Sequence, residues 1–110
     1  MPKTVPDVLD ILTQDYTLAF KTSEDMPDSY GLCHLDDRHI DIREGMSDFD
    51  VRDTVLHEVM HAIRHSQGRP YGGEVEEDYV RSLATGLIAV FHRNPQFAKW
   101  LISHPRKNKT

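Results

Sequence analysis

One pentapeptide limits what this chain can fold into: the sequence contains His57-Glu58-Val59-Met60-His61. On a helix, side chains four residues apart point the same way and lie about one turn apart, so both imidazoles can share one metal ion. Two histidines leave room for a third protein ligand and a water, which Glu58 can reach without binding the metal. With 7 His and 6 Glu in 110 residues, about 0.02 matches to this HExxH pattern arise by chance. The pentapeptide therefore predicts a Zn²⁺ site on a helix.

Composition and charge indicate one small domain. A chain of 110 residues with 38% hydrophobic and 28% charged content supplies a single modest core, so we expect one domain over residues 1–110. The net charge of −5 argues against a nucleic-acid partner, which would require a basic surface to offset phosphate charge. The one basic cluster lies near the C-terminus, and we expect residues 104–110 to form a flexible tail.

The number of cysteines and the length of the apolar segments indicate the cellular compartment. Cys33 is the only cysteine, which excludes an internal disulfide and favours a reducing compartment, with Cys33 as a small buried residue in a strand. The N-terminus has no unbroken apolar segment of the kind a signal peptide needs, and the longest apolar run, residues 87–91, is too short to span a bilayer. We expect no membrane partner and a cytoplasmic location.

The first half of the chain predicts one helix and three strands. Residues 4–12 predict a short helix capped by Thr4, because Pro6 is tolerated in a first turn and apolar residues follow at helical spacing. Residues 16–20 are β-prone and predict a strand. Residues 30–43 predict a β-hairpin about Asp36-Asp37, because apolar and polar residues alternate on its second strand. We expect His34 and His39 to be exposed residues of this hairpin.

The second half predicts helices. Ser47 or Asp48 can cap a helix over residues 48–66, whose apolar side packs on the sheet while the opposite side carries the two histidines. A Gly- and Pro-rich loop over 67–73 leads to a second helix over about 74–92. A short last helix begins at Asn94-Pro95, and we expect its apolar residues to pack in the core: Phe97, Trp100, Leu101 and Ile102. The whole predicts an α+β fold with a small, mostly antiparallel sheet.

The third metal ligand must come from another element. Helical periodicity excludes Glu74 and places Glu76 and Glu77 each about 50° from the centre of the apolar stripe of the second helix. Periodicity alone leaves both residues open.

The combination of the segment 57–65, a short loop and the segment 77–84 resembles the ImmA/IrrE-type zinc metallopeptidases, including small phage-associated relatives. The resemblance covers roughly residues 30–91. It implies a minimal zincin-like domain in which His57, His61 and Glu77 bind Zn²⁺. Arg81 stands where the family usually has Asn or Asp. On this assignment, replacing Glu76 by Gln should change the zinc affinity little.

The resemblance also implies a function. We expect a zinc-dependent endopeptidase in which Glu58 takes a proton from the attacking water and returns it to the leaving amine. The implied substrate is a protein or peptide in a bacterial or phage-infected cell, with a transcriptional regulator as one candidate. Stabilisation of the tetrahedral oxyanion falls to Tyr71, Tyr79 or His65, and the sequence does not rank these three.

Two rival functions remain. The first is a zinc-stabilised interaction module that keeps this fold and binds a partner without turnover, although structural zinc sites have no need of a base such as Glu58. The second is a SprT-like DNA-linked protease, which needs a third histidine ligand and a basic surface. His92 and His104 are badly placed for that ligand, and the net charge disfavours that surface.

Overall fold

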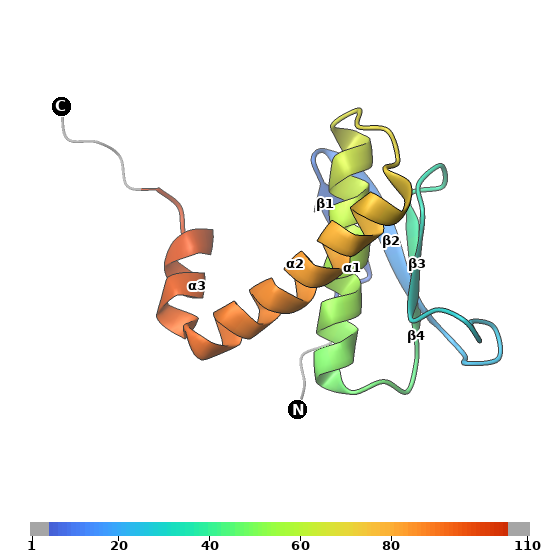
Figure 1. Cartoon of the computed structure of the whole chain (residues 1–110), viewed down its shortest axis with the longest axis horizontal. Helices are drawn as coiled ribbons and strands as arrows, with labels where there is room; N and C mark the ends of the chain where they lie inside the picture. The colour runs from blue at the N-terminus through green and yellow to red at the C-terminus, as the bar shows by residue number, and fades with distance from the viewer. Residues whose placement is uncertain (1–4, 106–110) are drawn as a thin grey trace.

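The computed structural model describes residues 5–105. Its elements, in chain order, are β1 (Val8–Ile11), β2 (Gln14–Lys21), β3 (Gly31–His34), β4 (His39–Arg43), α1 (Asp48–Ser66), α2 (Gly73–Arg93) and α3 (Pro95–Ile102). The strands form one sheet in the order β1-β2-β4-β3, α1 lies along this sheet, and α2 crosses α1 (Figure 1). The β2–β4 pair is parallel and the other two pairs are antiparallel. The predicted α+β class with a small, mostly antiparallel sheet is confirmed.

The N-terminal segment is a strand, so the predicted helix over 4–12 is wrong; its proposed cap, Thr4, lies outside the described residues. β1 pairs with β2 through a two-residue turn in which Leu12 and Thr13 have φ of 52° and 72°, the sign that tight hairpin turns require at both positions. The carboxylate of Asp10 accepts the backbone N–H of Thr13 at 2.8 Å. The apolar residues of this segment suit a helix or a strand, and pairing with β2 decides between them.

The core lies between the sheet and α1. Ile40 and Ile42 on β4 are fully buried and pack with Ala62 of α1. The other members of the cluster, together with the half-buried α1 residues packed against it, are Ile11, Tyr16, Leu18, Val55, Val59 and Ile63. The prediction that the apolar side of this helix packs on the sheet is therefore confirmed.

The start of α1 follows the predicted cap. The side chain of Ser47 accepts the backbone N–H of Asp50 at 3.1 Å, and α1 runs over the residues that the sequence predicted. Capping at Ser47 fixes where the helix begins and hence how far along the sheet His57 and His61 lie.

A polar cluster ties β3 to β4 on the side of β4 opposite its buried isoleucines. His34 and His39 both donate to the carboxylate of Asp41, at 2.9 and 2.7 Å. Burial opposes ionisation of Asp41, but these two hydrogen bonds outweigh it and lower the pKa of its carboxyl group. His34 is exposed as predicted, whereas His39 is half-buried. The cluster holds β3 in register as the last strand of the sheet.

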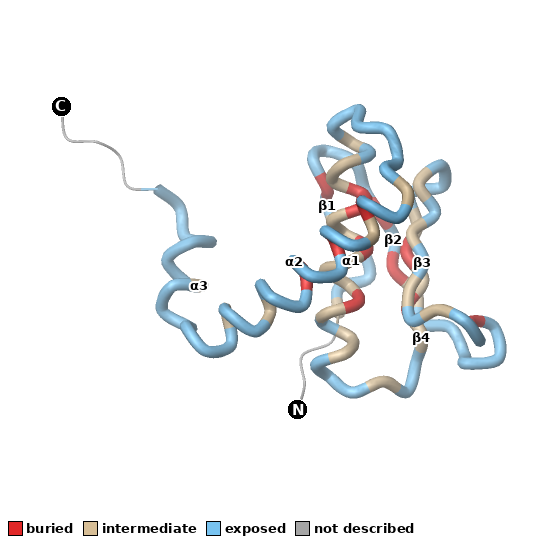
Figure 2. Tube along the Cα trace, in the orientation of Figure 1, coloured by how far each residue is buried: buried red, intermediate tan, exposed pale blue. Residues whose placement is uncertain are grey.

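The C-terminal arm, residues 94–102, lies away from this body at the far end of α2 (Figures 1 and 2). No residue of α3 is buried, and Trp100 is 70% exposed, so the prediction that the last helix packs in the core is wrong. Phe97 of α3 instead contacts Phe91 near the end of α2, with ring centroids 6.1 Å apart. Of the predicted tail, residues 106–110 lie outside the described part of the chain. Within residues 5–105, no helix has the length and apolar character needed to cross a membrane.

Candidate metal centre

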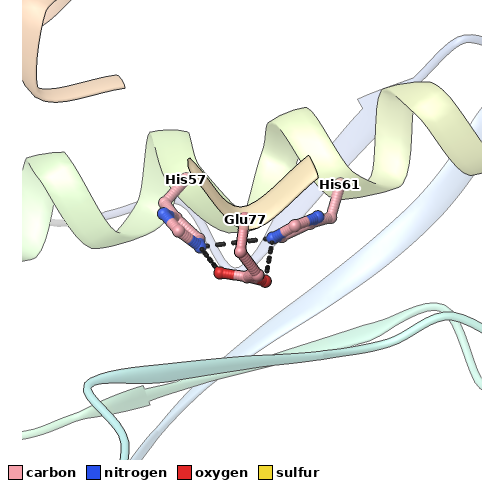
Figure 3. Close-up of side chains that lie close together, drawn as sticks. All are labelled: His57, His61 and Glu77. Atoms are coloured by element: carbon pink, nitrogen blue, oxygen red, sulfur yellow. Dashed lines mark hydrogen bonds and ion pairs between the residues drawn. The ribbon is translucent and has the colours of Figure 1, made fainter. Parts of the chain in front are cut away.

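His57 and His61 lie one turn apart on α1 and point to the same place (Figure 3). Their ring centroids are 4.9 Å apart and their Nε2 atoms 3.2 Å apart. Burial lowers the pKa of His57, partly offset by Glu77, which favours the neutral imidazole that a metal ion requires. Two imidazole nitrogens therefore converge on one point beside the helix.

Glu77 reaches this point from α2 (Figure 3). Its Oε1 is 2.8 Å from His61 Nε2, and its Oε2 is 3.3 Å from His57 Nε2. In a tetrahedral site with metal–ligand bonds of about 2.0 Å, ligand atoms lie about 3.3 Å apart, close to the spacing seen here. His57, His61 and Glu77 form a group that can hold a metal ion.

Glu76 occupies the other side of His61. Its buried carboxylate accepts the Nδ1–H of His61 at 2.6 Å, which leaves the lone pair of Nε2 directed at the metal position. The other oxygen of Glu76 accepts hydrogen bonds from Arg64 Nε at 2.8 Å and from the backbone N–H of Gly72 at 3.0 Å. Burial opposes ionisation, but these three hydrogen bonds outweigh it and lower the pKa of Glu76.

This contact revises one expectation. Replacing Glu76 by Gln was expected to change metal affinity little, yet the carboxylate accepts three hydrogen bonds that one amide cannot accept together. Periodicity treated Glu76 and Glu77 alike because they lie on either side of the same stripe. Their separate roles depend on how α2 crosses α1, which no local pattern in the sequence reveals.

Glu58 lies beside the three convergent side chains without joining the group that can hold a metal ion. It is only 7% exposed, and burial raises the pKa of its carboxyl group to about 7, with His61 lowering and Glu77 raising it to lesser degrees. The start of β3 packs against it: a Cβ atom on Gly31 would lie 3.0 Å from Glu58 Oε2 and 2.5 Å from Thr54 Cγ2. Glycine at position 31 thus allows the last strand of the sheet to approach α1 closely at Glu58.

Two clefts meet at Glu58. One, of about 450 Å³, is lined by His57, Glu58, Gly31 and Arg81 among others. The other, of about 220 Å³, is lined by Glu58, His61, Glu77 and Tyr71, together with apolar residues of β3 and the turn that follows it. A molecule that lies along β3 from one cleft to the other passes Glu58 and the two histidines.

The structure separates the three residues proposed for the oxyanion. Tyr71 lines the cleft beside His61, with ring centroids 6.3 Å apart. Tyr79 lines a cleft between α1 and α2 on the other side of Glu76, and His65 lines one at the β3–β4 turn. The sequence identified Arg81 only as a departure from the family pattern; in the structure its Nη2 is 3.8 Å from Glu77 Oε2, one turn along α2.

A scan of protein-family models and searches of curated proteins and of solved structures give no match to this chain. The geometry alone shows a small α+β domain in which two helices bring together a His-His-Glu group that can hold a metal ion.

Proposed function

We propose that this protein is a zinc-dependent metallopeptidase that hydrolyses internal peptide bonds of proteins. The observation that carries the proposal is Glu58, a buried carboxyl group with a pKa of about 7 that lies beside the converging metal-ligand atoms and between two clefts. Two imidazoles and one carboxylate are a donor set of catalytic zinc sites, which leave a fourth position for water or substrate. His57, His61 and Glu77 would hold the ion.

Glu58 is the group that moves the proton. Bound Zn²⁺ would polarise the scissile carbonyl and lower the pKa of the attacking water. Glu58 accepts a proton from that water as the oxygen bonds to the carbonyl carbon, and it returns the proton to the amide nitrogen as the C–N bond breaks. The pKa of about 7 belongs to the metal-free protein, and the charge of a bound cation would lower it, so that Glu58 would be ionised and able to accept the proton.

The edge of β3 is the surface that we assign to the substrate. β3 is the last strand of the sheet among the described residues, so an extended peptide can pair with it as a fifth strand. Because Gly31 lies against Glu58, a peptide paired there passes in front of the base and the metal ligands. Tyr71, at one end of this path, is our candidate for stabilising the oxyanion.

The resemblance to ImmA/IrrE-type metallopeptidases agrees with this proposal, since the glutamate that it selects, Glu77, is the one that reaches both histidines. From the resemblance we propose a cytoplasmic protein substrate, with a transcriptional regulator as one candidate.

The test must separate this enzyme from a zinc-stabilised interaction module of the same fold. The purified protein is analysed for metal content and then incubated with a denatured protein mixture, with and without a chelator. The proposal expects one zinc per chain and cleavage that the chelator abolishes and added zinc restores. One zinc per chain without chelator-sensitive cleavage of any substrate would favour the interaction module.

A further inference from the structure

The C-terminal arm presents apolar side chains that remain largely uncovered within residues 5–105. Figure 2 shows the end of α2 and the whole of α3 exposed or only half-buried. Trp100 is 70% exposed and Ile102 is 83% exposed, and Phe97 and Leu101 also lie at the surface. An eight-residue helix is marginal in water without packing, so α3 requires a partner surface.

A matching apolar groove lies on the body of the same chain. It opens between the first half of α1 and the last turns of α2, has a volume of about 540 Å³, and is lined mainly by aliphatic and aromatic residues. The main ones are Val51, Val55, Leu56, Ile88 and Phe91. A helix with an apolar side can lie in a groove of this kind through residues one turn apart.

The arm cannot cover this groove in its own chain. Asn94 alone separates α2 from α3, whereas two packed antiparallel helices need a connection of about two to eight residues. α3 therefore cannot fold back along α2, whose last turns form one wall of the groove.

We propose that a second copy of this chain fills the groove, so that the α3 helices of two copies exchange and each packs between α1 and α2 of the other. The same chain carries both surfaces, which is the condition for a symmetric, closed pair. Charge does not oppose this occupant: Asp48 and Arg52, which line the groove, pair with each other at 2.7 Å, and α3 contains Lys99 and no acidic residue.

The size of the contact is sufficient. Phe97 and Trp100, which are 44% and 70% exposed, together offer on the order of 170–290 Å² per copy, and Leu101 and Ile102, 50% and 83% exposed, add a comparable apolar area. With the groove surface that they cover, the buried area reaches the order of 1,200 Å² at which specific dimers begin to be stable. Exchange leaves the two clefts at Glu58 open, because none of their lining residues belongs to the arm or lines the groove.

The test is the oligomeric state of the full chain, measured by sedimentation equilibrium over a range of concentrations. We expect a mass of twice 12.7 kDa, and a shift of the emission of Trp100, the only tryptophan, to shorter wavelength as dimer forms. Trp100→Glu on the arm and Val51→Glu in the groove should each weaken the dimer by roughly 30-fold or more. Val75→Glu, at a 66% exposed valine outside both surfaces, should leave it unchanged.

Mixing the two variants identifies the occupant. The Trp100→Glu copy keeps an intact groove and the Val51→Glu copy keeps an intact α3, so a mixture should associate more tightly than either variant alone. Circular dichroism of each variant checks that it is folded. A wild-type protein that is monomeric at about 100 μM would overturn the proposal. So would a mixture of the two folded variants that associates no more tightly than each variant does with itself.

Discussion

The Nδ1–H of His61 donates to the carboxylate of Glu76 at 2.6 Å, from the opposite side of the ring to the Nε2 that faces Glu77. The imidazole therefore lies between two adjacent glutamates of α2. Glu76 orients the ring, and Glu77 belongs with His61 to the group that can hold a metal ion. Because Glu76 also accepts from Arg64 and Gly72, it joins α1, α2 and the loop between them at the metal centre.

Replacing Glu76 by Gln should lower zinc affinity by roughly 10- to 100-fold, the range found when a group that orients a ligating histidine is lost. The amide cannot accept from His61, Arg64 and Gly72 together, so the ring loses its fixed orientation. Competition with a chromogenic chelator measures the affinity, and Glu74→Gln, at an exposed residue of the same helical turn, is the matched control. An affinity equal to that of the control would show that Glu76 does not position His61.

Replacing Glu77 by Gln should lower zinc affinity by roughly 10-fold or more and at least as much as Glu76→Gln does, because it removes the anionic ligand itself. The two variants are compared in the same competition assay. If only Glu76→Gln weakened binding, the third ligand would not be Glu77 and the arrangement drawn in Figure 3 would not be the zinc-bound one.

Much of the site followed from the sequence because it depends on local spacing. The HExxH pattern and the cap at Ser47 fixed the helix and the direction of both histidines, and α1 has its predicted bounds. Glu76 and Glu77 could not be separated in this way, since their roles depend on the crossing of α1 and α2. The same limit explains why the predictions for β1 and α3 were wrong. Whether an apolar segment forms a strand, or packs in the core, depends on the elements beside it, which the local sequence does not show.

Burial of Glu58 should make the stability of the metal-free protein depend on pH. Its pKa is about 7 in the fold against 4.5 for the free group, so the native state binds more protons and loses stability as pH rises from about 4.5 to 7. Gln resembles the protonated form. At pH 8 the free energy of unfolding of Glu58→Gln, measured by urea denaturation, should therefore exceed that of the wild type by up to about 3 kcal/mol. At pH 4 the two free energies of unfolding should be nearly equal.

The control for this measurement is Glu44→Gln, at an exposed carboxylate, which should leave the pH dependence of unfolding unchanged. A wild type as stable as Glu58→Gln at pH 8, with metal removed from both, would show that the buried carboxyl group ionises without cost.

Replacing Tyr71 by Phe, with the same change at Tyr79 as control, tests which hydroxyl stabilises the oxyanion. Tyr71→Phe removes the hydroxyl in the cleft beside His61 and should lower kcat by roughly 10- to 100-fold with little change in KM, because the contact forms only in the transition state. Tyr79→Phe removes a similarly exposed hydroxyl outside that cleft and should leave kcat unchanged. Unchanged kcat in Tyr71→Phe would assign the oxyanion to another group, and Arg81, whose Nη2 lies 3.8 Å from Glu77 Oε2, would be tested next.

The most direct test of the central claim is the turnover of Glu58→Gln measured with its zinc content. Gln keeps nearly the same shape but cannot accept a proton, so the variant should retain one zinc per chain and lose roughly 10²-fold or more in turnover. Loss of zinc would place Glu58 in the metal's coordination or its support. Zinc retained with cleavage at close to the wild-type rate would contradict the account, because Glu58 would then not be the base.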